Sequence, residues 1–262
     1  MSRAAVVQAK RVVIKIGSST LTGSAGHELD ETAVKNIVDV VASLRDLGKE
    51  VVLVSSGAIA AGLSPLKLSA RPTDLVTQQA VASVGQGLLI ASYSRAFATH
   101  KLIASQVLLT IEDVERESHS ENAKHTLNKL IEMGVVPIIN ENDSVGVQEI
   151  RMGDNDRLSA FVAGLIEANL LALVTDVDGL YNVPPHEPGS TRISEVQDAS
   201  HLGDIEIGGV GTSGVGSGGM VTKIEAAKIA TDSGITMLLT SLPNLAQTLK
   251  GEDLGTIFHA KH

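Results

Sequence analysis

Short apolar runs rich in Val, Ile and Leu recur along the chain, and each is bounded by turn-forming residues. Runs of this kind, without alternating polar positions, are typical of strands that are buried on both faces of a parallel sheet. The pattern predicts six such strands, at residues 12–16, 51–54, 102–109, 135–139, 170–174 and 235–239.

Apolar residues three and four positions apart lie between several of these runs and indicate amphipathic helices. The predicted helices cover residues 34–44, 123–131, 158–166 and 222–233. Three of them end before a glycine, which is a common way for a helix to stop. Alternating strands and helices joined by right-handed crossovers predict an α/β fold, with one mainly parallel sheet covered on both faces. In such folds ligands bind beyond the carboxyl ends of the strands.

Composition and charge narrow the range of functions. The chain has 262 residues, of which 21 are Lys or Arg and 30 are Asp or Glu, so its net charge is −9. This balance argues against binding to nucleic acids or to anionic membranes. The absence of cysteine excludes disulfides, thiolate zinc sites and a cysteine nucleophile, and it fits a reducing compartment. No apolar run approaches the roughly 18 residues of a membrane helix. We therefore expect a cytoplasmic protein that acts on small molecules.

The ends of the first two predicted strands carry small and hydroxyl-bearing residues. Lys15 precedes the turn 17–20 (GSST), and the second strand runs into residues 55–58 (SSGA). Amides and hydroxyls in such turns can hold phosphate oxygens while a lysine supplies compensating charge. The alternatives are a solvated lysine beside a serine-rich turn, and a tight strand-to-helix connection that needs glycine for packing.

Polar residues gather between residues 140 and 156, where one cluster follows a predicted strand and another precedes a predicted helix. Both positions lie where a substrate pocket is expected. A solvated acidic loop is the alternative, and Asp154 or Asn155 could simply cap the helix.

The segment 208–219 (GGVGTSGVGSGG) leads into a predicted helix that contains Lys223. Backbone amides at a helix start, with a lysine nearby, suit nucleotide phosphates, whereas a flexible linker is the alternative. The segment lacks the lysine and hydroxyl of a Walker A loop after Gly219, and it does not directly follow a strand as a dinucleotide fingerprint does.

Seven motifs, taken in order, resemble the amino acid kinase family over about residues 12–259: VVIKIGSSTLT, VVLVSSGAIAAG, ASQVLLT, PIINENDSV, MGDNDRLSA, LVTDVDGLY and GTSGVGSGGMVTK. The resemblance implies a three-layer α/β/α sandwich with a mainly parallel central sheet. It also implies a single kinase domain over residues 1–262, with the acceptor site mainly in the N-terminal part and the ATP site mainly in the C-terminal part. The RNA-binding-like PUA domain of many members is not expected here.

The resemblance implies ATP-dependent phosphorylation of the γ-carboxylate of L-glutamate, the first step of proline synthesis, with Mg²⁺ carried by ATP. The implied catalytic residues are Lys15, Lys223 and Asp156, the last orienting both lysines. The implied glutamate-binding residues are Ser56, Asn140, Asp143, Asp154 and Asn155. The implied ATP-binding residues are Lys15, Gly17, Thr175, Asp176, Ser217, Gly218, Gly219, Met220, Val221, Thr222 and Lys223. Proline is a candidate feedback inhibitor, and a homo-oligomer, either a dimer or a tetramer, is expected.

Elementary chemistry agrees with these roles. Phosphoryl transfer to a carboxylate brings two anions together, so catalysis depends on positioning and on cations. The attacking carboxylate is already ionised at neutral pH and needs no general base. Two alternatives stay open: another kinase of the family that uses acetylglutamate or carbamate, and a non-catalytic sensor of nucleotide or amino acid.

Overall fold

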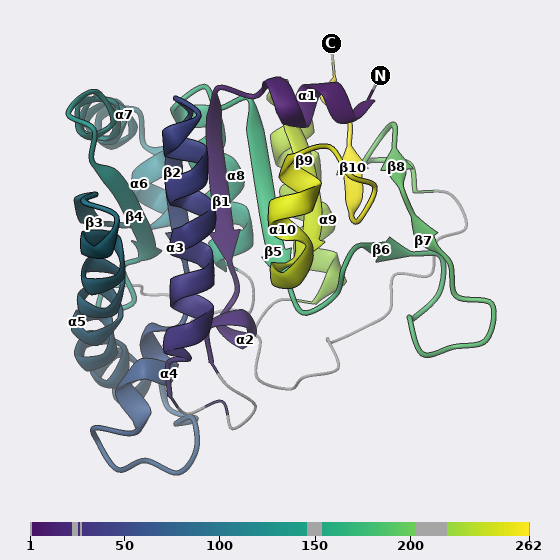
Figure 1. Ribbon diagram of the computed structural model, residues 1–262. Coiled ribbons are helices and arrows are strands. Elements are labelled where there is room, and N and C mark those ends of the chain that lie inside the picture. Colours follow the sequence, from purple (N-terminus) through teal and green to yellow (C-terminus); the bar gives the residue numbers. More distant parts are fainter. Residues whose placement is uncertain (1, 23–25, 27, 146–153, 203–218, 262) are drawn as a thin grey trace.

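The computed structural model describes residues 2–22, 26, 28–145, 154–202 and 219–261. At its centre is an eight-stranded sheet (Figure 1). From one edge to the other, its strands are β3 (Ala104–Leu109), β4 (Val136–Glu141), β2 (Glu50–Ser55), β1 (Arg11–Ile16), β5 (Leu170–Thr175), β9 (Thr236–Ser241), β10 (Thr256–Phe258) and β8 (Glu195–Val196). Neighbouring strands are parallel except β9 and β10. Two short strands, β6 (Leu180–Tyr181) and β7 (Arg192–Ile193), form a separate antiparallel pair.

Helices cover both faces of the sheet and complete a three-layer sandwich (Figure 1). One layer, called here the α8 side, contains α6 (Ile111–Glu115), α7 (Glu117–Glu132), α8 (Asp154–Leu165) and α9 (Met220–Asp232). The other, called the α3 side, contains α1 (Ser2–Gln8), α3 (Glu31–Asp46), α5 (Leu75–Thr99) and α10 (Leu242–Leu249). Two short helices, α2 (Ser18–Leu21) and α4 (Ala58–Leu63), follow the carboxyl ends of β1 and β2.

The six predicted strands are confirmed as β1 to β5 and β9, and the four predicted helices as α3, α7, α8 and α9. The long helix α5 was not predicted. Its apolar residues lie on all sides, since Tyr93 and Phe97 are fully buried while Val76 and Leu88 are exposed, so it lacks the period of an amphipathic helix. Although α5 has 25 residues, neither it nor any other described helix is both long and apolar enough to span a membrane.

The helices α4 and α5 pack with their backbones in contact at two glycines. A Cβ atom on Gly85 would lie 1.8 Å from the carbonyl oxygen of Ala58, and one on Gly62 would lie 2.2 Å from that of Val81. Only glycine permits such an approach. This contact holds α5 against the helix that follows β2, and therefore close to the carboxyl edge of the sheet.

Candidate active site

The predicted site motifs meet at the carboxyl edge of the sheet. Parallel pairing aligns the ends of β1, β2 and β5, and backbone hydrogen bonds continue beyond them. The amide of Ser56 donates to the carbonyl of Ile16 at 3.0 Å, and the amide of Gly17 donates to that of Val174 at 3.3 Å. The turns that follow three separate strands are thus brought side by side.

Two lysines and one aspartate form a buried ion cluster on the α8 side. Lys15 faces this side because it lies two residues after Val13, whose side chain is in the core between the sheet and α8. Its Nζ lies 2.5 Å from Oδ1 of Asp156 on α8, and Nζ of Lys223 on α9 lies 3.5 Å from Oδ2. Asp156 is fully buried, and each lysine is only 6% exposed. The two lysines therefore share one carboxylate.

Burial and charge oppose each other in this cluster. Burial by itself would raise the pKa of Asp156, but the positive charges of Lys15 and Lys223 outweigh it and hold that pKa below its usual range. Burial lowers the pKa of Lys223, and Asp156 only partly offsets this shift. Asp156 is thus an anion at neutral pH, and one carboxylate faces two ammonium groups. The cluster as a whole favours an additional anion, such as a phosphate.

The start of α9 completes the cluster. Oγ1 of Thr222 lies 2.8 Å from Oδ2 of Asp156, so it supports the same carboxylate oxygen that faces Lys223. Asp176, at the end of β5, also acts electrostatically on Lys223, and it accepts a hydrogen bond of 2.9 Å from Oγ1 of Thr175. The first turn of α9, whose leading backbone amides have no acceptor within the helix itself, lies next to these charges.

Side-chain amides form a second network beside the ion cluster. Nδ2 of Asn155 donates to Oγ of Ser56 at 3.1 Å and to Oδ1 of Asn140 at 3.0 Å. The backbone amide of Glu141 donates to Oδ1 of Asn140 and to Oδ1 of Asn155. Asn140 is only 2% exposed and donates in turn to Oε1 of Gln86, on α5, at 2.8 Å. This network joins residues from β4, α8, α5 and the end of β2.

Asp143 is half-buried, shortly after β4, and has a cationic neighbour. Burial lowers the pKa of the Arg71 guanidinium, and the negative charge of Asp143 opposes that shift. By solvent accessibility Arg71 is an exposed residue. A carboxylate and a guanidinium therefore lie close to each other, three residues along the chain from Asn140 in the case of Asp143, and such a pair could hold an amino acid by both of its charged groups.

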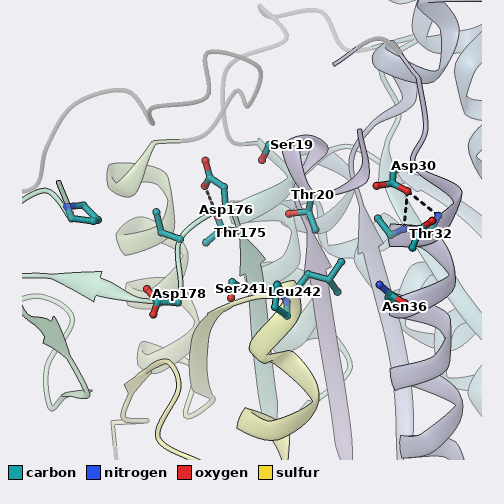
Figure 2. Close-up of a pocket in the computed structure, with 14 residues that line it drawn as sticks. Ser19, Thr20, Asp30, Thr32, Asn36, Thr175, Asp176, Asp178, Ser241 and Leu242 are labelled. Carbon is teal, nitrogen blue, oxygen red and sulfur yellow. Dashed lines mark hydrogen bonds between the residues drawn. The ribbon is translucent and has the colours of Figure 1, made fainter. Parts of the chain in front are cut away.

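A cavity of about 570 Å³ opens on the α3 side of the same edge (Figure 2). Its walls come from α2, the start of α3, the end of β5 and the start of α10, with Ser19, Thr20, Asp30, Thr32, Ala33, Asn36, Thr175, Asp176, Val177, Asp178, Pro185, Ser241, Leu242 and Pro243 as the lining residues. The charged residues among these are all acidic. Hydroxyl groups and carboxylates can accept hydrogen bonds from the hydroxyl or amino groups of an uncharged part of a ligand. The negative carboxylates would repel a phosphate group.

The structure brings together most of the predicted site residues. Lys15, Lys223, Asp156 and Thr222 make direct contacts, as do Ser56, Asn140 and Asn155. Gly219 is the N-cap of α9, and Met220 and Val221 open its first turn, with the Val221 side chain 50% exposed. Ser217, Gly218 and the side chain of Asp154 lie outside the described residues.

Two residues near the site were missed by sequence reasoning. Gln86 lies in α5, the helix without a periodic pattern, and Arg71 lies in the connection before that helix. A glycine beside Gln86, within an otherwise apolar stretch, was the available signal for a close helix contact.

The chain is similar in sequence to a known protein family and to curated proteins. The model of the amino acid kinase family matches residues 10–241. A glutamate 5-kinase of Salinispora arenicola is 57% identical over 254 residues, covering 97% of this chain and 69% of the relative. A glutamate 5-kinase of Streptomyces coelicolor is 55% identical over 259 residues, covering 99% of this chain and 69% of the relative.

Two solved structures have a similar fold at low sequence identity. Carbamate kinase from Giardia lamblia, bound to AMP-PNP, superposes with a TM-score of 0.68 at 18% identity and covers 97% of this chain and 99% of its own. UMP kinase from Bacillus anthracis gives a TM-score of 0.64 at 15% identity, with 97% of each chain covered. At this low sequence identity, the two similarities support the fold and nothing further.

Proposed function

The chain belongs to the amino acid kinase family, and on that premise we propose that it transfers the γ-phosphoryl group of ATP to the γ-carboxylate of L-glutamate. The product, L-glutamyl 5-phosphate, is the first intermediate of proline synthesis. The observation that carries the residue-level proposal is the buried cluster in which Lys15 and Lys223 share the single carboxylate of Asp156. The two lysines come from β1 and α9 and converge on one carboxylate, so both cations lie where they can stabilise a transferring phosphoryl group.

Lys15 and Lys223 neutralise the charge that develops as the glutamate carboxylate approaches the γ-phosphorus. Asp156 does not accept a proton in this scheme, because its pKa is held low and the acceptor is already ionised. Asp156 instead fixes both ammonium groups. Mg²⁺ would enter with the phosphates of ATP and supply further charge neutralisation. Asp176 acts electrostatically on Lys223, so its carboxylate would be near enough to help orient the Mg²⁺ ion.

Ser56 is the proposed donor to a glutamate carboxylate. Its Oγ accepts a hydrogen bond from Asn155, so its own hydroxyl proton is free to point at the substrate. Both amide protons of Asn155 are directed at protein acceptors, so Asn155 contributes mainly by orienting Ser56. We assign the substrate ammonium group to Asp143 and include Asn140 and Asp154 among the residues that form the glutamate site.

ATP would lie along the carboxyl edge, between the turn 17–20 and the first turn of α9. In this arrangement the phosphates face Lys15, Lys223 and the amides from Gly219 onward, and the predicted Ser217 and Gly218 immediately precede these amides in the chain. The cavity in Figure 2 shares Thr175 and Asp176 with the predicted nucleotide site, and none of the described residues that line it is a lysine or an arginine. It therefore suits the neutral part of a nucleotide better than its phosphates.

A trapping assay tests the function directly. The protein, ATP, Mg²⁺ and L-glutamate are mixed with hydroxylamine, which converts an acyl phosphate to a hydroxamate, and ADP release is followed in parallel. Glutamate should give product, whereas N-acetylglutamate and carbamate should give little. Turnover with either of those two instead would favour the other kinases of the family. Binding of ATP and glutamate without ADP release would favour a sensor and overturn the proposal.

Several broader features are proposed with this function. Residues 1–262 would form one kinase domain, a dimer or tetramer would be the working assembly, and the cytoplasm, where ATP and glutamate are abundant, would be the location. Proline is the candidate feedback inhibitor. Adding proline to the glutamate assay tests this last point, and an unchanged rate at saturating proline would contradict it.

A further inference from the structure

We propose that Gln86 is a positioning residue of the glutamate site: it accepts the hydrogen bond that holds the Asn140 amide in its place and, through Asn155, supports the direction of the Ser56 hydroxyl. The proposal rests on the proposed function, because it assigns Gln86 to binding of that substrate. Gln86 itself lies one step behind the residues expected to touch glutamate.

The orientation of the two asparagine amides is set by a backbone donor. The amide N–H of Glu141 can only donate, and it lies 2.9 Å from Oδ1 of Asn140 and 3.2 Å from Oδ1 of Asn155. The Nδ2 atoms of both asparagines must then point away from it. Nδ2 of Asn155 reaches Ser56 and Oδ1 of Asn140, while Nδ2 of Asn140 reaches Oε1 of Gln86 at 2.8 Å.

Gln86 is the acceptor that makes this arrangement favourable. Asn140 is 2% exposed, so an Nδ2 group without an acceptor would be costly there. Without Gln86, neither orientation of Asn140 is satisfied. In the present orientation its Nδ2 loses its acceptor, and in the flipped one its Nδ2 faces the Nδ2 of Asn155 and the Glu141 amide, which are both donors. The network would then lose the contact that turns the Asn155 amide toward Ser56.

The backbone places Gln86 for this role. Gly85, the preceding residue, approaches the carbonyl of Ala58 so closely that its added Cβ would lie 1.8 Å away. Ala58 is the first residue of α4, two positions after Ser56. The helix contact that brings Gln86 to Asn140 therefore also fixes the end of β2 that carries Ser56. Gln86 and Ser56 are held in one rigid arrangement around the asparagines.

The test compares Gln86→Leu and Gln86→Met with the wild-type protein, using Ser83→Ala on the exposed face of the same helix as a control. Loss of the acceptor should raise the KM for glutamate about tenfold, while the KM for ATP changes less than twofold. The thermal midpoint should fall by only a few degrees, as expected for one buried donor without its acceptor, and the circular dichroism spectrum should change little. Ser83→Ala should leave all of these values unchanged.

Coupling to Ser56 separates positioning from a general structural role. The dissociation constant for glutamate is measured by calorimetry in Gln86→Leu, Ser56→Ala and the double variant. If Gln86 acts through Ser56, its effect should largely vanish in the Ser56→Ala background. Full additivity, an unchanged affinity in Gln86→Leu, or equal losses for ATP and glutamate would overturn the inference. Absence of turnover in the wild type would reject the proposed reaction, whereas the calorimetric comparison would still decide the role of Gln86.

Discussion

Asn155 and Asp156 are consecutive residues at the start of α8, yet their side chains join two different networks. Asn155 bonds to Ser56 and Asn140, and Asp156 contacts Lys15 and Lys223. Successive side chains on a helix point about 100° apart, so one turn of α8 can face both networks. The proposed acceptor and the proposed phosphoryl group would meet where these two side chains diverge, so one short motif would serve both proposed substrates.

The alkaline limb of the pH profile should report on Lys223. Burial lowers the pKa of Lys223, so the residue loses its proton, and the site loses a cation, at a lower pH than an exposed lysine would. We expect kcat to fall on the alkaline side, and the midpoint of that fall to move to higher pH in Lys223→Arg, because arginine stays charged. Lys228→Arg, on the exposed face of α9, is the matched control. The same midpoint in both variants would remove Lys223 from the ionisation that limits the rate.

Asp156→Asn should reduce both activity and stability. The change leaves two buried ammonium groups without their shared anion, which typically costs about 3–5 kcal/mol of folding free energy when a buried pair is broken. We expect kcat to fall at least about a hundredfold, as for loss of a preorganised electrostatic contact. Rates and urea unfolding at neutral pH measure the two effects. Asp39→Asn, which breaks the exposed 2.6 Å pair with Lys35, serves as the control and should change neither strongly.

The stability difference between wild type and Asp156→Asn should depend on pH. The folded-state pKa of Asp156 is lowered, so its contribution is fully present above the unfolded value of about 3.9 and is lost as pH falls through the folded value. We therefore expect the two unfolding curves to converge below about pH 4. A difference that stays constant into that acid range would contradict the lowered pKa.

Asp143→Asn should weaken binding of substrates that carry an ammonium group. With L-glutamate, loss of the proposed charge pair should lower kcat/KM at least tenfold, which corresponds to about 1.4 kcal/mol. Glutarate, which has the two carboxylates but no ammonium group, should react poorly with the wild type and should be affected little by the substitution. Steady-state rates with both acids measure the ratio. An equal loss for glutamate and glutarate would place Asp143 away from the ammonium group.

Two glycines on α5 should respond in opposite ways to alanine. Gly85→Ala places a methyl group 1.8 Å from the Ala58 carbonyl and should destabilise the fold strongly, by several times the roughly 1 kcal/mol of an ordinary substitution. Gly87→Ala meets no atom within 4 Å and should stabilise the helix by up to about 1 kcal/mol. Thermal unfolding of the two variants measures both effects. Similar midpoints would contradict the backbone contact between α4 and α5.

Much of the architecture could be predicted because its signals are local. Buried strands such as residues 51–54 and 170–174 are continuous apolar runs, and helices such as α3 carry an apolar stripe with a polar opposite face. The helix α5 carries no such stripe, since it is apolar around its circumference, and it was missed together with Gln86. The small strands β6 to β8 and β10 are too short to have a period of their own.

The sequence by itself determined which chemistry is present: the lysine before the turn 17–20, the polar cluster at residues 140–156 and the lysine at the start of the last long helix. Only the tertiary structure decided that Lys15 and Lys223 share the single carboxylate of Asp156, and that Asn140 depends on Gln86. Hydrophobic periodicity reports which face of an element is buried, but not which side chains from distant elements meet there. Contacts between side chains of distant elements depend on the order of strands in the sheet and on close helix packing such as that at Gly85. Both are determined by the packing of the whole chain.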